Sequence, residues 1–242
     1  MIIFLRKRTL AGVGMAAAVL LSCVFCRGIA PGVVSVFAPG GDVPLVVVID
    51  PGHGGEDGGA VSAAGAEESR INLDIALRLN RLLRFCGTRT LMTRMDESSI
   101  GDPDLKTVRE RKASDLKMRV KLVNDAENAV LLSIHQNSLP SSPVTHGAQA
   151  FWNLHPGSQE LAKEIQGALN TQINTERPKE AKEISSTIYL MKHVQAPAVL
   201  VECGFLSNAA EAERLQEESY QTKLAAVIAA GYLECLNGEK GP

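Results

Sequence analysis

Two kinds of hydrophobic pattern alternate along the chain from about residue 45 onward. Runs of β-branched and other apolar residues are typical of strands, and they occur at 45–50, 90–93, 129–134, 147–152, 188–191 and 198–201. Between them, apolar residues recur every three or four positions, which predicts amphipathic helices at 68–85, 116–123, 161–169 and 220–231. This alternation predicts one three-layer α/β domain, with a mostly parallel twisted sheet of about six strands and helices on both faces.

The first 42 residues have a different pattern. A basic cluster at 6–8 precedes an uncharged stretch at 9–26 and a Pro/Gly-rich segment, as in a secretory signal peptide or a membrane anchor. A proline follows each small-residue site at which a signal peptidase would cut, Ala30 and Ala38, so a cleaved leader and an uncleaved anchor both stay open. We therefore expect a leader and linker at 1–42, a folded domain at 43–237 and a tail at 238–242.

Composition and charge narrow the class of protein. The chain is 45% hydrophobic and 21% charged, which is enough apolar material for a folded core. Lys and Arg number 25 against 27 Asp and Glu, so the formal net charge is -2. Nucleic-acid binding normally needs a basic excess, so we expect no nucleic-acid partner.

Candidate chemistry lies at the carboxyl ends of three predicted strands. His53 follows the first strand in a glycine-rich turn, His135 ends the strand at 129–134, and Glu202 ends the strand at 198–201. Ligands of open α/β sheets bind outside these strand ends, so the three side chains are expected to meet there. A single histidine at a strand end is commonly a surface residue, but a carboxylate between apolar segments needs a cation or hydrogen bonds.

Glu68 admits two interpretations from its position alone. It begins a predicted helix, where an acidic residue is stabilised by the helix dipole. It is also a candidate third ligand beside His53 and His135, since two imidazoles and a carboxylate form the ligand set of zinc hydrolases. In that case Glu202 is free to act as a general base towards water, and the expected reaction is hydrolysis of an amide.

Four motifs in order surround these residues: IDPGHGGEDGGA at 49–60, ESRINL at 68–73, SIHQNS at 133–138 and PAVLVECGFLSN at 197–208. Together they resemble the zinc-dependent N-acetylmuramoyl-L-alanine amidases of the Amidase_3 type. The resemblance extends over about residues 43–236. Four motifs in a fixed order are far more specific than any one of them.

The resemblance implies a site and a substrate. One zinc ion is held by His53, Glu68 and His135, and Glu202 is the catalytic acid/base. The bond cleaved joins the lactyl group of N-acetylmuramic acid to the L-alanine of the stem peptide in peptidoglycan. Segment 43–237 is then the catalytic domain, exported to the outer face of a bacterial membrane or to the cell wall.

Three further segments resemble the germination-specific, spore-cortex branch of this family: 111–120, 147–152 and 188–192. This branch removes the peptide from muramic acid in cortex maturation, the first step towards muramic-δ-lactam, and it implies a location in the forespore or cortex space. Targeting is expected from the N-terminal segment, by membrane association, or from an accessory protein.

Alternative functions stay open at this point. One alternative is an amidase of vegetative wall turnover or cell separation. Another is a wall-binding protein whose zinc is structural. A closed structural zinc site prefers four protein ligands, which argues against the latter. A general metallopeptidase is disfavoured because the sequence has no HExxH helix.

Four other residues have less specific interpretations. Asn137 is a candidate substrate-binding residue, or it satisfies its own turn. Arg94 and Arg119 are expected to pair with nearby acids rather than with the substrate. Cys203 is expected to point away from Glu202, because successive strand residues face opposite sides of a sheet.

Overall fold

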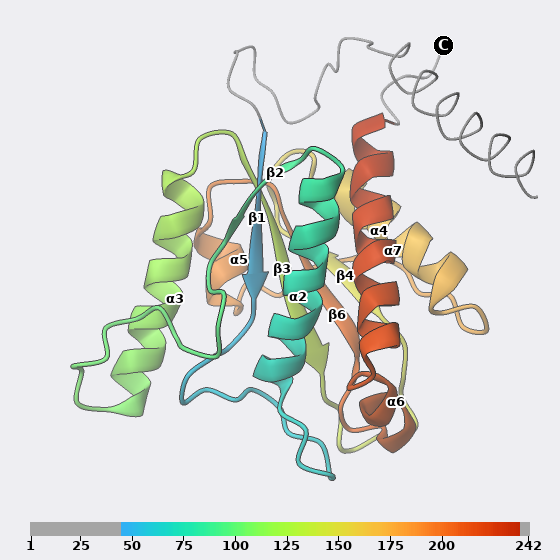
Figure 1. Cartoon of the computed structure of the whole chain (residues 1–242), viewed down its shortest axis with the longest axis horizontal. Coiled ribbons are helices and arrows are strands. Elements are labelled where there is room, and N and C mark those ends of the chain that lie inside the picture. The colour runs from blue at the N-terminus through green and yellow to red at the C-terminus, as the bar shows by residue number, and fades with distance from the viewer. Residues whose placement is uncertain (1–44, 238–242) are drawn as a thin grey trace, which may run out of the picture. The chain divides into compact units, whose positions relative to one another are not determined.

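The computed structural model describes residues 45–237, so the leader predicted at 1–42 and the tail at 238–242 lie outside the described residues. The described part contains one six-stranded sheet with helices on both of its faces (Figure 1). This confirms the predicted α/β class and the mostly parallel sheet. Within the described residues, none of the helices combines the length and apolar character needed to span a membrane.

The sheet has the strand order β2-β1-β3-β6-β4-β5. Strands β2, β1, β3 and β6 are mutually parallel, and β4 runs antiparallel to β6. The strands are β1 (Val46–Pro51), β2 (Arg89–Met92), β3 (Ala129–Asn137), β4 (Gln149–Trp152), β5 (Lys182–Glu183) and β6 (Ala198–Phe205). The helices are α2 (Glu68–Phe85), α3 (Val108–Asp125), α4 (Ser158–Gln172), α5 (Tyr189–His193), α6 (Ala209–Arg214) and α7 (Glu218–Asn237).

Two hydrophobic cores lie on opposite faces of the sheet. Alternate residues of β1 divide between them, since Val47 and Ile49 pack in the core under α2, α4 and α7 while Val48 packs in the core under α3 and α5. The central strands are buried on both faces, which is why they appear in the sequence as continuous apolar runs.

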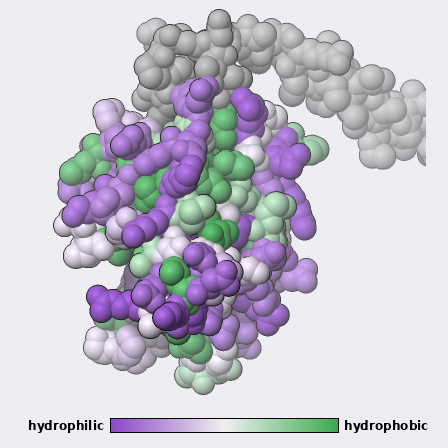
Figure 2. All heavy atoms as spheres, turned by 90° about the vertical axis from the view of Figure 1, so that its left-hand side faces the viewer, coloured by the Kyte–Doolittle hydropathy of each residue, from purple (hydrophilic) through white to green (hydrophobic). Residues whose placement is uncertain are grey.

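Helix α3 differs from the other long helices because its surface is charged nearly all round. Its buried residues are Asp115, Arg119 and Val123, spaced by four and therefore on one face. A capping box starts the helix, in which the Thr107 hydroxyl accepts from Glu110 N–H and the Glu110 carboxylate accepts from Thr107 N–H. The face of the molecule that carries α3 is mostly hydrophilic (Figure 2).

The predicted strand at 188–191 is wrong. Residues 189–191 belong to the short helix α5, which Ile188 precedes, and Leu190 and Met191 are buried. A four-residue apolar run is too short for its period to distinguish a strand from a helix. The sixth strand is instead β5, a two-residue exposed edge strand without a hydrophobic pattern, and the short helix α6 was not predicted.

Because β1, β3 and β6 are adjacent and parallel, their carboxyl ends meet at one edge of the sheet. The arrowheads of β1 and β3 point towards the lower side of Figure 1, where the segment that leads to α2 emerges. Residues that follow or end these three strands are therefore brought together there.

Candidate active site

All five predicted site residues, including Asn137, line one hollow at this edge, with a volume of about 480 Å³. His53 follows β1, His135 lies near the end of β3, and Glu202 lies in β6, where it pairs in register with His135. Glu68 is the first residue of α2 and enters the hollow from the helix N-terminus. The topology therefore gathers residues that are far apart in the sequence.

His53, Glu68 and His135 form a compact group of possible metal ligands. Each residue offers one potential ligand atom, and these three atoms all lie within 4.8 Å of one another. Glu68 Oε1 is 3.2 Å from His53 Nε2 and 2.9 Å from His135 Nδ1. The two imidazole rings are 5.1 Å apart, nearly edge to face. Three potential donor atoms thus lie close enough together to bind one metal ion.

The Glu68 carboxylate is fixed by further hydrogen bonds. Its Oε2 accepts from Ala60 N–H at 2.9 Å, and its Oε1 accepts from Gln136 N–H at 3.2 Å and from the Asn72 amide at 3.3 Å. The Asn72 amide also donates to the Gly52 carbonyl at 3.2 Å. Glu68 is therefore tied to both the 52–60 turn and β3.

His53 is oriented by a carboxylate on its other nitrogen. Its Nδ1 lies 2.9 Å from Asp57 Oδ2, which leaves Nε2 directed at Glu68. An Nδ1–H bond of this kind selects the tautomer whose Nε2 lone pair is free for a metal. Asp57 is in turn paired with Lys112, whose Nζ lies 2.8 Å from Asp57 Oδ2.

The electrostatics of the group favour a cation. Burial lowers the pKa of His53, but hydrogen bonds and charges from Asp57 and Glu68 outweigh burial and raise this pKa to about 9. Burial raises the pKa of Glu68, whereas the two histidines hold it far below its ordinary value. Without a metal the group holds a proton instead, and metal binding is expected to release that proton.

Glu202 is a carboxylate of the hollow that does not belong to the candidate ligand group. Burial and the charge of Glu68 raise its pKa to about 7, although His135, His53 and Lys179 act in the opposite direction. Its buried Oε2 has no hydrogen-bond partner among the described residues. A buried carboxylate with a free oxygen and a pKa near neutrality is suited to take up and return a proton.

Two arginines hold the turn that carries His53. Arg119 donates to the carbonyl of Pro51 at 2.7 Å and to that of His53 at 2.6 Å. Arg94 donates to the carbonyls of Pro51 and Gly52, both at 3.0 Å. His53 has a φ of 61°, a left-handed conformation that is uncommon for a side-chain-bearing residue. The arginines supply contacts that stabilise this conformation.

Gly52 leaves the space that His135 occupies. A Cβ at Gly52 would lie 2.2 Å from Cε1 and Nε2 of the His135 ring. We expect Gly52→Ala to displace this ring and to weaken metal affinity by roughly 10- to 100-fold, as loss of supporting contacts around metal ligands does. Titration of the purified variant with zinc against a chromogenic chelator measures this.

Gly167→Ala is the matched control, because a Cβ at Gly167, within α4, meets nothing within 4 Å. This control is expected to keep the parent zinc affinity. Parent-like zinc binding by folded Gly52→Ala would show that the position of the His135 ring does not determine the affinity.

The family can be assigned once this geometry is compared with known proteins. The sequence profile described as Amidase_3, N-acetylmuramoyl-L-alanine amidase, matches residues 47–234. The chain belongs to this amidase family. All four candidate residues lie within the matched segment.

Several amidases share both sequence and fold with this chain. The germination-specific N-acetylmuramoyl-L-alanine amidase of Bacillus subtilis is 40% identical over 198 residues, which cover 81% of each chain. The amidase LytC of the same organism is 31% identical over 188 residues, 76% of this chain and 34% of LytC. The CwlD amidase of Clostridioides difficile, solved in complex with the GerS lipoprotein, has a TM-score of 0.76 and 35% identity, covering 80% of this chain and 98% of CwlD.

The less specific predictions have mixed outcomes. Asn137 lines the hollow, and its Oδ1 accepts from Ser138 N–H at 2.8 Å, so it does satisfy its own turn; its binding of substrate stays a prediction. Cys203 is fully buried in the core under α2, α4 and α7, away from the hollow. Arg119 pairs with acids as expected, whereas the hydrogen bonds found for Arg94 go to backbone carbonyls.

Sequence reasoning missed Asp57 and Lys112 in this amidase. Asp57 follows His53 by four residues within the same glycine-rich motif, and that spacing was the available signal. Lys112 lies 55 positions further along the chain, on α3, and no local pattern connects it with His53.

Proposed function

We propose that this amidase hydrolyses the bond between N-acetylmuramic acid and the L-alanine of the stem peptide with one zinc ion held by His53, Glu68 and His135. The observation that carries the proposal is the convergence of two imidazoles and one carboxylate beside a free glutamate. Two histidines and a carboxylate are a catalytic zinc set, with the fourth position left for water or substrate.

The donor atoms fit such an ion in type and spacing. The distances of 3.2 and 2.9 Å between Glu68 Oε1 and the histidine nitrogens are close to the ligand separation in a tetrahedral site. That separation is about 3.3 Å when the bonds to zinc are about 2.0 Å long. Zinc bound here supplies Lewis acidity, both to the scissile carbonyl and to the water that attacks it.

The protein's own part in the reaction is proton transfer by Glu202. Its carboxylate takes a proton from the attacking water as the oxygen bonds to the carbonyl carbon. The same proton then passes to the amide nitrogen as the C–N bond breaks. The products are the free lactyl carboxylate on the sugar and a peptide with a free L-alanine amine.

Product analysis with metal analysis tests this proposal. The full chain is expected to contain about one zinc per molecule and to release stem peptides that begin with L-alanine from intact peptidoglycan. Removal of zinc with a chelator should abolish release, and added zinc should restore it. Bound zinc without any released peptide would support the wall-binding alternative, and cleavage of ordinary peptides would support a metallopeptidase.

We further propose that the chain acts in spore-cortex maturation. Support comes from the identity with the germination-specific amidase of B. subtilis and from the structural similarity to CwlD. Cortex fragments from cells that lack the protein are then expected to lack muramic-δ-lactam in mass spectra. Normal δ-lactam together with altered vegetative wall fragments would assign the protein to wall turnover.

We also propose that the chain is exported and that it binds an accessory partner. The basic cluster and the uncharged stretch at 9–26 support delivery across a membrane or attachment to it. The complex of CwlD with the GerS lipoprotein supports a lipoprotein partner for this chain as well. Crosslinking in sporulating cells is expected to join the chain to such a lipoprotein, and crosslinks to cytoplasmic proteins alone would contradict both expectations.

A further inference from the structure

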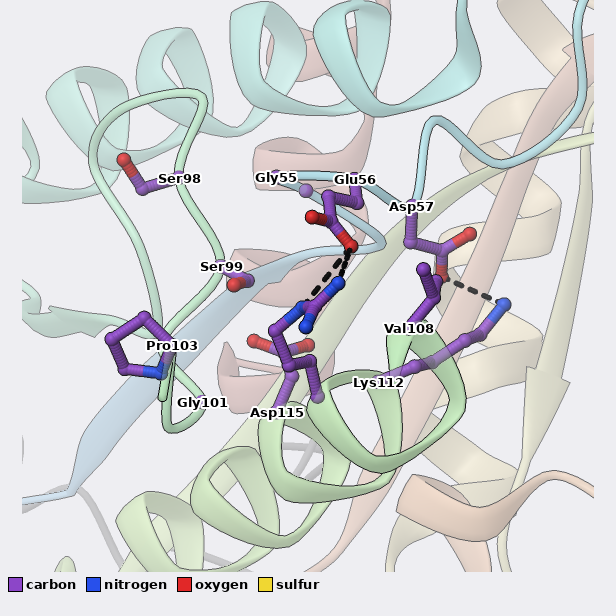
Figure 3. Close-up of a pocket in the computed structure, with 12 residues that line it drawn as sticks. Gly55, Glu56, Asp57, Ser98, Ser99, Gly101, Pro103, Val108, Lys112 and Asp115 are labelled. Atoms are coloured by element: carbon purple, nitrogen blue, oxygen red, sulfur yellow. Dashed lines mark hydrogen bonds and ion pairs between the residues drawn. The ribbon is translucent and has the colours of Figure 1, made fainter. Parts of the chain in front are cut away.

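A second hollow adjoins the one that contains the candidate metal ligands. It lies between the turn at 54–57, the loop at 98–103 and the first turns of α3, and its volume is about 470 Å³ (Figure 3). Asp57, Lys112 and Asp115 line both hollows. The two hollows therefore share part of their walls beside Lys112.

Two charged pairs in the second hollow are already satisfied by the protein. Asp115 accepts from Arg119 Nε at 2.7 Å. Arg111 donates from Nε and Nη2 to Glu56 Oε2, at 3.1 and 2.7 Å, and from Nη1 to a backbone carbonyl. These bonds use three of the five N–H donors of Arg111, and each of the two charges has an opposite charge beside it.

Lys112 differs from Arg111 because it lines both hollows and its side chain is more exposed than that of Arg111, which is 24% exposed. Its Nζ contacts Asp57, and Asp57 Oδ2 is shared with His53 Nδ1. The ammonium has three N–H donors, and the side chain is 49% exposed. Figure 3 shows Lys112 reaching from α3 towards Asp57 at the side of the hollow. Lys112 therefore offers an anion unused donors at the junction of the two hollows.

The remaining wall of the metal-site hollow has a different chemistry. Helix α5 and the residue before it contribute Ile188, Tyr189 and Leu190. Apolar and aromatic surfaces gain by covering carbon, such as the ring and lactyl carbons of a muramoyl group. They carry no positive charge for a carboxylate. The two halves of the substrate thus meet surfaces of different character.

We propose that the second hollow receives the stem peptide and that Lys112 binds a carboxylate of the residue following L-alanine. This inference rests on the proposed function, because it places the scissile amide at the metal centre. It assigns the muramoyl group to the α5 wall and makes Lys112 a specificity residue for peptides with a free carboxylate.

Two muramoyl dipeptides provide the test, one with the second residue's carboxyl group free and one with the same group amidated. The parent enzyme is expected to have a KM about tenfold lower for the free acid, because its carboxylate accepts a charge-assisted hydrogen bond from Lys112 that the amide cannot form. Lys112→Met should remove this preference, and Lys112→Arg should retain it. Lys117→Met is the matched control, since Lys117 is an exposed lysine of α3 that lines neither hollow.

The ratio of the two KM values distinguishes binding from support of the metal site. If Lys112 only oriented Asp57 and His53, Lys112→Met would slow both substrates equally and leave their ratio unchanged. Equal KM values for the parent enzyme, or a preference that survives in Lys112→Met, would overturn the inference. Failure of the parent to cleave either substrate would instead contradict the proposed function.

Discussion

Glu202→Gln is expected to reduce hydrolysis of muramoyl peptides by roughly a hundred- to ten-thousandfold, the range typical for loss of a general acid or base. The amide has nearly the shape of the carboxylate but cannot take up the proton released by water. Glu202 is not one of the three grouped donors, so bound zinc should stay at the parent level. Initial rates and elemental analysis on the same preparations measure both quantities.

Glu68→Gln gives the contrasting result. Glu68 Oε1 contacts both histidines, so this variant is expected to lose zinc together with activity. If Glu202→Gln also lost zinc, Glu202 would be a ligand and the assigned roles would be wrong. If it kept both zinc and full activity, another group would have to supply the proton transfer.

The sequence was sufficient to predict how the candidate ligands come together. Strands β1, β3 and β6 are buried on both faces and appear as unbroken apolar runs, so their carboxyl ends could be located. The predicted helix at 68–85 has the bounds of α2, because its apolar residues recur over five turns. The prediction that three side chains meet at one edge of the sheet followed directly from these strands; they are His53, His135 and Glu202.

The rest depends on contacts that local patterns do not encode. The buried positions of α3 are Asp115, Arg119 and Val123, and a sequence window cannot distinguish a buried Arg–Asp pair from a solvated one. The interaction of Lys112 with Asp57 joins α3 to the turn after β1 and depends on how the helix packs. Such positions become predictable only when the tertiary structure is known.

Arg119 is the centre of a buried polar cluster beneath the candidate metal site. It is 1% exposed, and it donates to Asp50 Oδ1 and Asp115 Oδ2, both at 2.7 Å. It also donates to the carbonyls of Pro51 and His53. One guanidinium thus bonds to two buried carboxylates and holds the turn that carries a candidate metal ligand, which a lysine lacks the donors and geometry to do.

The Asp50 carboxylate depends on this arginine for its charge. Burial raises the pKa of Asp50, but the charge of Arg119 and the hydroxyls of Thr93 and Ser133 bring it below its ordinary value. A carboxyl group with a lowered pKa in the folded state stabilises the fold above its unfolded-state pKa, about 3.9 for Asp. That stabilisation is lost as the pH falls through the folded-state value.

Arg119→Met is therefore expected to destabilise the domain by about 3 to 5 kcal/mol at neutral pH, because it leaves buried carboxylates without a cation. For a domain of this size, the melting temperature should fall by about 6 to 20 °C. Lys121→Met is the control on the same helix, since it breaks only an exposed pair with Asp125 and should change stability by less than about 1 kcal/mol. Thermal unfolding followed by circular dichroism compares the three proteins.

The pH dependence separates lost charge compensation from lost packing. Without Arg119, burial raises the pKa of Asp50, so the carboxyl becomes protonated and tolerable in the variant as the pH falls towards about 4. The parent keeps most of the stabilisation from its ionised Asp50 over this range, because that is lost only as the pH falls below the unfolded-state pKa of about 3.9. The difference in melting temperature between the parent and Arg119→Met should therefore narrow from pH 7 to pH 4. A constant difference would show that the lost stability comes from packing around the Arg119 side chain rather than from its charge.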